Sequence, residues 1–85
     1  MTKMPVFLGV HKLPSDMTDS QASEGFAKYK ESAKAKGLIP LSAVYSLEKG
    51  FAYCQTEAEN ADLVREAHQD ATIPLEDVIE VKPLS

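Results

Sequence analysis

The stretch FAYCQTEAENADLVREAHQD, residues 51–70, combines a thiol, an imidazole and, between them, a carboxylate, which are groups of the types that bind transition metals or serve in catalysis. They are Cys54, Glu57 and His68, and Cys54 is the only cysteine of the chain. Thiolate, carboxylate and imidazole groups are ligands of transition metals. The sequence has no C-x-x-C, H-x-x-x-H or EF-hand pattern, so short motifs alone do not define a site. Whether these residues and the other histidine, His11, act together depends on the elements that position them.

Apolar periodicity and turn residues predict six elements in the order βαββαβ. Thr18 and Gln21 form a T-x-x-Q capping box at a helix start, and Gly37 is typical of the position after a helix. Gly50 suits the left-handed position of a three-residue hairpin loop over 48–50. We expect strands over 4–11, 38–47, 51–57 and 76–82, and helices over 18–37 and 60–71.

This order predicts an α+β, ferredoxin-like fold for residues 1–85 as a single domain. Its four-stranded antiparallel sheet would have the order 4-1-3-2, with both helices on one face. That topology carries His11, His68 and the pair Glu76–Asp77 to the hairpin end of the sheet. Cys54 is expected in the middle of its strand, with Glu57 at the opposite end. Cys54, Glu57 and His68 are therefore not expected to form a single site.

Each candidate also has a structural explanation. Cys54, between Ala52 and Thr56 on its face of the strand, is typical of a small buried residue. His68 suits the C-terminus of a helix, and Glu57 suits a position just before a helix N-terminus. Nothing structural calls for an imidazole at His11, at a strand end before a proline-containing loop. We therefore expect His11 to contribute more to metal binding than Cys54 does.

The sheet face away from the helices is expected to be apolar. In the hairpin, Tyr45 should lie opposite Tyr53, and Leu47 opposite Phe51. A monomer would expose the apolar side chains of this surface, and exposed apolar area on this scale usually marks an interface. We expect a homodimer formed through the sheet by Phe7, Tyr45, Leu47, Phe51 and Tyr53.

Composition narrows the range of partners. A net charge of −4 and a pI near 5.0 argue against nucleic acid and against anionic membranes, because both require a positive protein surface. No apolar run has the length of a membrane span, and the first residues do not have the pattern of a signal peptide. A single cysteine cannot form an internal disulfide, which fits a reducing compartment. These features predict a cytoplasmic protein.

Four segments together resemble the small nickel-binding, ferredoxin-like bacterial proteins, a family long described only as of unknown function. They are MPVFLGVHKLP near the N-terminus, CQTEA, the helical REAH and the closing VIEV. The resemblance covers nearly the whole chain and implies a βαββαβ dimer that binds a divalent metal, nickel in at least some members. By position, it matches His11, Cys54, Glu57 and His68 to the family's motif residues.

The residue types support binding of a transition metal, but they do not single out nickel. Imidazole suits several metals, and an unselective site would prefer copper to nickel. Two facing chains would double the supply of ligands, so a site at a dimer interface is also expected. The candidate ligands are His11, Cys54, His68, Glu57, Glu76 and Tyr45.

Two other classes of function remain open. One is a small dimeric α+β barrel enzyme, monooxygenase-like or isomerase-like, with a closed pocket between helices and sheet. Its polar groups would be Tyr45, Tyr53, His11 and Cys54. The other is an interaction module without a site. The sequence contains no nucleophile–base pair that would establish catalysis.

Overall fold

The computed structural model of the chain describes residues 4–82 and residue 84, and confirms the predicted element order. Every predicted element appears, and each of its ends lies within two residues of the predicted position. The elements are β1 (Val6–Lys12), α1 (Asp19–Ala35), β2 (Ile39–Ser46), β3 (Phe51–Glu57), α2 (Ala61–Asp70) and β4 (Asp77–Val81).

Local side-chain chemistry explains where the helices begin and end. The Thr18 hydroxyl accepts a hydrogen bond from the backbone N–H of Gln21, and the Gln21 side chain accepts one from the N–H of Thr18. This is the predicted capping box, and Gly37, with φ 79°, follows the end of α1. Asn60 caps α2 by accepting from the N–H of Leu63 at 3.0 Å.

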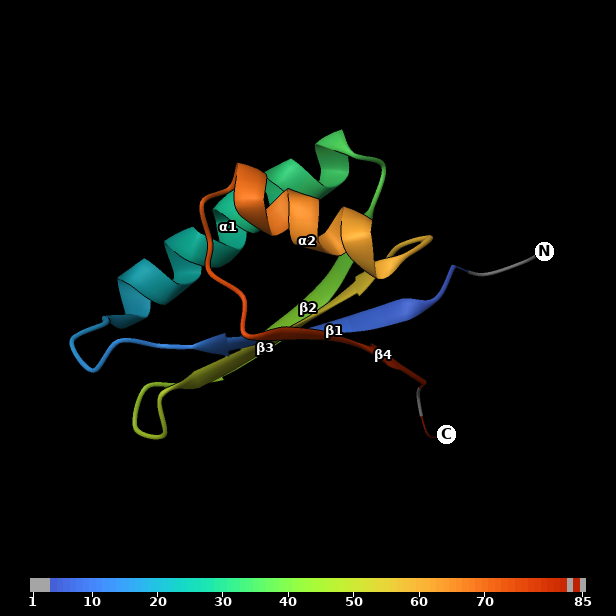
Figure 1. Ribbon diagram of the computed structural model, residues 1–85. Helices are drawn as coiled ribbons and strands as arrows, with labels where there is room; N and C mark the ends of the chain where they lie inside the picture. The colour runs from blue at the N-terminus through green and yellow to red at the C-terminus, as the bar shows by residue number, and fades with distance from the viewer. Residues whose placement is uncertain (1–3, 83, 85) are drawn as a thin grey trace.

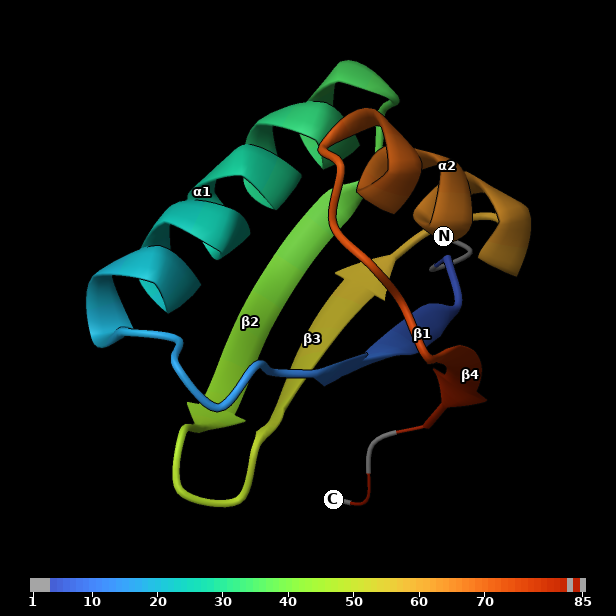
Figure 2. The same ribbon diagram turned by 60° about the vertical axis from the view of Figure 1, so that its left-hand side comes forward.

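The four strands form one antiparallel sheet in the order β2-β3-β1-β4, which is the predicted order read from the other edge. Both helices lie on the same side of this sheet (Figure 1). The helix α1 runs beside β2, and α2 lies toward β1 and β4 (Figure 2). No helix or strand among residues 4–82 covers the opposite face of the sheet.

The hydrophobic core lies between the sheet and the two helices. It combines small and medium side chains with two aromatic residues, Phe7 and Tyr29, and it also contains Cys54. The expectation of a small buried residue at position 54 is confirmed, since Cys54 is only 4% exposed. The buried apolar residues are Phe7, Tyr29, Ala33, Leu38, Cys54, Ala58, Val64, Ala67 and Val78.

The predicted hairpin register is wrong by one residue. Val44, not Tyr45, pairs with Tyr53, and Ser46, not Leu47, pairs with Phe51. The cause is a loop of four residues, 47–50, in place of the expected three, although Gly50 does adopt the left-handed φ of 76°. Because side chains alternate between the faces of a strand, a shift of one residue moves each of them to the other face.

This shift changes which residues form the uncovered face. Tyr45 belongs to the helix side, where its hydroxyl donates to Asp19 Oδ1 at 2.9 Å. Phe7 also belongs to that side and is buried in the core. The uncovered face is nevertheless apolar, because the alternation places a different set of side chains on it. The apolar members of that set are Val6, Leu8, Val10, Ile39, Val44, Phe51, Tyr53, Ile79 and Val81.

In the part of the chain described, neither helix has the length and the apolar character needed to cross a membrane.

Candidate metal centre

Three side chains from three different elements meet between α2 and the sheet. His11 comes from β1, Cys54 from β3 and His68 from α2. Cys54 Sγ lies 3.4 Å from His11 Nε2 and 3.5 Å from His68 Nε2, and the three donor atoms all lie within 4.8 Å of one another. The two imidazole rings have centroids 5.0 Å apart. The predicted convergence of the two histidines is present, and Cys54, which was expected apart from them in the middle of its strand, lies with them.

The pairing of β1 with β3 explains how Cys54 reaches the histidines. Gly9 pairs with Cys54 and His11 with Ala52, so these residues face the helices together. His11 and Cys54 are therefore diagonal neighbours on the same face of the sheet, within reach of each other's side chains. His68, on the last turns of α2, completes the group from above the sheet.

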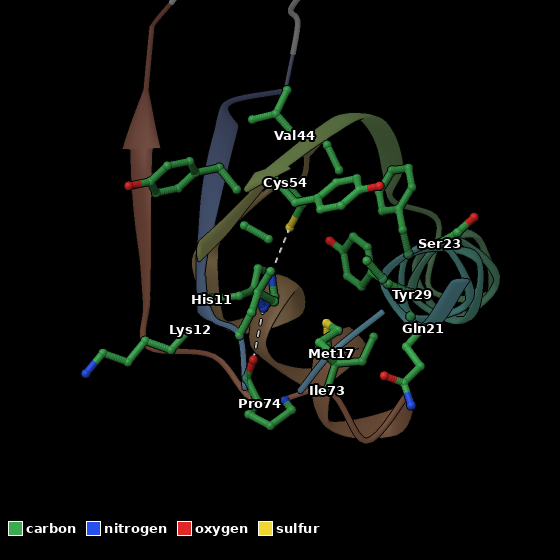
Figure 3. Close-up of a pocket in the computed structure, with 18 of the residues that line it drawn as sticks. His11, Lys12, Met17, Gln21, Ser23, Tyr29, Val44, Cys54, Ile73 and Pro74 are labelled. Atoms are coloured by element: carbon green, nitrogen blue, oxygen red, sulfur yellow. Dashed lines mark hydrogen bonds between the residues drawn. The ribbon is translucent and has the colours of Figure 1, made fainter. Parts of the chain in front are cut away.

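Backbone carbonyl groups hold both imidazoles in one orientation. His11 Nδ1 lies 3.0 Å from the carbonyl oxygen of Pro74, as Figure 3 shows, and His68 Nδ1 lies 2.7 Å from that of Val64. A carbonyl oxygen only accepts, so each Nδ1 carries the hydrogen and donates it. In the neutral imidazole the other nitrogen, Nε2, is then a free acceptor. Such second hydrogen bonds are typical of metal-binding histidines.

The three donor atoms of this group have too few hydrogens for all of them to form hydrogen bonds with one another. The two Nε2 atoms and Cys54 Sγ face one another, and the only hydrogen among the three atoms is that of the thiol. The S–H group can donate to one imidazole at a time, which leaves the other Nε2 lone pair facing sulfur. A cation in place of that hydrogen would satisfy all three donors together. The His11–Cys54–His68 cluster therefore could hold a metal ion.

Burial keeps the cluster neutral when no metal is bound. Desolvation lowers the pKa of His11, against a hydrogen bond to Pro74 that raises it. Desolvation lowers the pKa of His68 to about 4, and the nearby His11 adds to this effect. Burial raises the pKa of the Cys54 thiol to about 11. These shifts disfavour a thiolate–imidazolium pair at neutral pH, which is the form in which the thiol of a cysteine nucleophile is activated.

Tyr29 fixes the remaining side of His68. Its ring stacks on the His68 imidazole with centroids 4.0 Å apart and planes inclined by 25°. Its hydroxyl forms a hydrogen bond of 2.5 Å with Thr56 Oγ1, and both residues are fully buried. Burial is also the main reason why the pKa of Tyr29 is raised to about 12. The stacked ring restrains the imidazole at the position where Nε2 faces Cys54.

Gly9 provides the space that the Cys54 sulfur occupies. A Cβ atom added at position 9 would lie 2.7 Å from Cys54 Sγ and 3.5 Å from His11 Nε2. The first distance is far below ordinary van der Waals contact, so no larger residue fits without moving the sulfur. This role of Gly9 was not predicted from the sequence. A glycine inside a strand does indicate close approach of another group, and that signal was present at Gly9.

The remaining predicted ligands lie outside the cluster. Glu57 is at the far end of β3, as expected, where it pairs with Val6 and Ile39. Glu76 is exposed, and its carboxylate does not belong to the group near the histidines. Its backbone N–H donates to the carbonyl oxygen of Val10. Asp77 accepts from the N–H of Val78, and the Tyr45 hydroxyl is bound to Asp19. Within residues 4–82, no other group of His, Cys, Asp and Glu is close enough to hold a metal.

A cavity of about 320 Å³ adjoins the cluster. It lies between the N-terminal half of α1 and the strands β2 and β3, and Figure 3 shows it with His11, Cys54 and Tyr29 on its border. Of the four residues proposed for an enzyme pocket, His11, Tyr45 and Cys54 line it from the helix side of the sheet; Tyr53 also borders it, but its side chain belongs to the uncovered face. Exposed Ala43 and Tyr45 also border the cavity, so it is not the closed pocket expected for such an enzyme.

The distances from the Cys54 sulfur to the two imidazoles suit a transition metal. Zinc–sulfur and zinc–nitrogen bonds of about 2.3 and 2.0 Å, at tetrahedral angles, place sulfur and nitrogen about 3.5 Å apart. The two Sγ–Nε2 distances are 3.4 and 3.5 Å. Three protein ligands with an adjoining cavity correspond to a tetrahedral site that keeps one open position.

Comparison with known proteins supports the fold. No family model matches the chain, and no curated protein matches its sequence. Among solved structures, SCO4226 from Streptomyces coelicolor A3(2) superimposes with a TM-score of 0.83 and 25% sequence identity, over 94% of this chain and 98% of that one. A match of this extent shows the same α+β arrangement from end to end.

The lowered pKa of His68 predicts that the free energy of unfolding of the metal-free protein decreases at acidic pH. The unfolded chain binds a proton near pH 6.5, and the folded chain only near pH 4. The stabilising contribution is thus complete above 6.5 and is lost as the pH falls toward 4, by about 3 kcal/mol at 1.36 kcal/mol per pKa unit. Urea unfolding at several pH values should show this loss. The free energy of unfolding of His68→Gln should decrease less over the same pH range. An equal decrease in both proteins would contradict the assignment of the effect to His68.

Replacement of Gly9 should damage the cluster directly. Gly9→Ala forces the Cys54 sulfur away from the added Cβ, so we expect at least about tenfold weaker metal binding and a stability loss of about 1–3 kcal/mol. Nickel titration and urea unfolding measure the two effects. Gly25→Ala in α1 is the matched control, because a Cβ there meets nothing within 4 Å. It should leave metal binding unchanged. Unchanged affinity in Gly9→Ala would show that the sulfur position does not matter.

Proposed function

We propose that this protein binds one divalent transition metal per chain through His11 Nε2, Cys54 Sγ and His68 Nε2. One observation supports this most strongly: three buried donor atoms face one another with a single hydrogen among them. A role as an interaction module alone does not account for that arrangement. A buried group of polar atoms without sufficient hydrogens costs stability, and a metal offsets this cost.

The donor set limits the identity of the metal. Two imidazoles and one thiolate suit nickel, copper and zinc, and do not suit the hard ions calcium and magnesium. The resemblance of the sequence to nickel-binding proteins supports nickel as the metal in the cell. At equal availability the same ligands would prefer copper. Nickel specificity is therefore proposed to depend on which metal the cell supplies, and a reducing cytoplasm would keep Cys54 available as a thiol.

We also propose that the protein is a homodimer through the uncovered sheet face. The support is the apolar character of that face, where Val44 is 62% exposed and Ile79 45% exposed. The proposed metal ligands lie on the helix side of the sheet, so each chain would contain a complete set. A ligand shared between two chains is no longer needed to explain metal binding.

Titration with nickel tests the ligand set. Wild-type protein should bind one ion per chain, and Cys54→Ser, His11→Gln and His68→Gln should each bind at least about tenfold more weakly, because each loses one direct ligand. Isothermal titration calorimetry measures the affinities, and thermal unfolding checks that each variant is folded. Glu57→Gln and Glu76→Gln are controls that should bind like wild type. A loss in Glu76→Gln, with none in Cys54→Ser, would place the metal at the sheet edge instead.

The pH dependence of the same titration reports on the thiol. Between pH 7 and 9 both histidines are already neutral and Cys54 is protonated, since its pKa is about 11. Metal binding must then release one proton, so affinity should rise about tenfold per pH unit. Cys54→Ser should lack this slope. A flat profile in wild type would mean that sulfur does not bind as the thiolate.

Charge on the uncovered face should dissociate the proposed dimer. Val44→Lys introduces a cation at the side chain that the monomer already exposes, so the fold should tolerate it while the interface does not. Sedimentation at micromolar concentration should give a dimer for wild type and a monomer for Val44→Lys. Ala27→Lys, on the exposed side of α1, is the control and should remain dimeric. A monomeric wild type would refute the proposal.

A further inference from the structure

The cavity beside the His11–Cys54–His68 cluster is mostly apolar. Its walls include the apolar residues Met17, Ala22, Phe26, Ala43 and Ile73. The polar ends of Lys12 and Gln21, which also border it, point away from the centre in Figure 3. A molecule in the cavity therefore meets hydrocarbon on most sides and donor atoms at one end.

Small residues create this space at the N-terminal half of α1. Ala22 and Gly25 of the helix face Ala43 and Ala52 of the hairpin across the cavity. A Cβ atom added at Gly25 would contact nothing within 4 Å, which shows how far the helix stands from the sheet there. In the other half of α1, Tyr29 and Ala33 are buried and fill the corresponding space. The opening is thus local to the region beside His11 and Cys54.

Volume limits the size of the ligand. A cavity of about 150 Å³ with apolar walls is sufficient to bind benzene. The cavity here, at about 320 Å³, has room for a single ring together with a small functional group. A larger molecule with several rings would extend beyond it.

Charge determines the functional group that faces the cluster. With a divalent metal, one thiolate and two neutral imidazoles, the centre carries a net charge of +1. A buried charge is costly unless it is paired, and the cavity walls provide no anion. One negative charge on the ligand would neutralise the centre and occupy the fourth position of a tetrahedral site.

We propose that the cavity binds an aromatic monocarboxylate, with the carboxylate at the metal centre and the ring between α1 and the hairpin. This inference rests on the proposed metal binding at the same residues. It assigns to the protein a small-molecule ligand of defined chemistry: one negative charge, one ring and no second charged group.

Three probes of matched chemistry separate the contributions of ring and charge. Cobalt(II) replaces nickel in the full chain, because its visible absorption reports changes in the ligands of the metal. Benzoate is compared with acetate, which lacks the ring, and with benzamide, which lacks the charge. We expect benzoate to bind at least about tenfold more tightly than either, a difference of about 1.4 kcal/mol.

Two substitutions test whether the ring enters the cavity. Ala43→Phe places a benzyl group in the space from β2 and should reduce the preference for benzoate over acetate to about twofold or less. Ala27→Phe makes the same change on the exposed side of α1, outside the cavity, and should retain the full preference. Both variants should bind cobalt like wild type, which shows that they are folded and that the cluster is intact.

The outcomes distinguish this inference from the proposed metal binding. If cobalt binds and benzoate shows no preference over acetate, or keeps its preference in Ala43→Phe, the cavity proposal is wrong and metal binding stands. If benzoate binds equally well without metal, or benzamide binds like benzoate, anchoring by charge is wrong. If cobalt does not bind to the wild-type protein, both proposals are refuted.

Discussion

The antiparallel pairing of β1 with β3 is the constraint on which the candidate site depends. It places Gly9 opposite Cys54 and His11 opposite Ala52, at the centre of the sheet. Because Gly9 has no side chain, the Cys54 sulfur can occupy the space above it and lie close to the His11 imidazole. A shift of this register by one residue would turn His11 to the uncovered face and remove it from the cluster.

The cluster uses core positions that apolar residues would otherwise fill. His68 is 1% exposed and Thr56 is fully buried, in a chain of only 85 residues with a correspondingly small core. Such a small domain has little stability in reserve. The hydrogen bonds to Pro74 and Val64 and the stacked ring of Tyr29 compensate for part of the cost of burying the imidazoles. A bound metal would stabilise the folded state further, because the unfolded chain does not preform its ligands.

The proposed metal binding and the proposed dimer formation use opposite faces of the sheet. The cluster and the adjoining cavity lie on the helix side, and the apolar set with Val44, Tyr53 and Ile79 lies on the other. Association through the uncovered face would leave the cavity mouth near Ala43 and Tyr45 open to solvent. Metal or ligand exchange would then not require the dimer to dissociate.

The sequence by itself determined the secondary structure and the topology, because these depend on local chemistry. The capping box at Thr18, the glycines at 37 and 50 and the apolar periodicities act over a few residues, and all were recognisable in the chain. The order of the elements then restricted the sheet to one arrangement and brought the two histidines to the same end of it. That part of the site followed from topology alone.

Only the tertiary structure decided which side chains meet. Cys54 joins His11 and His68 because the depth of a side chain between sheet and helix depends on packing: on the missing Cβ of Gly9 and on the ring of Tyr29 behind His68. Glu57, Glu76 and Tyr45 were also candidate ligands and lie outside the cluster: Glu57 is at the far end of β3, Glu76 is exposed, and the Tyr45 hydroxyl is bound to Asp19. These contacts join residues distant in the chain, and periodicity carries no information about such distances.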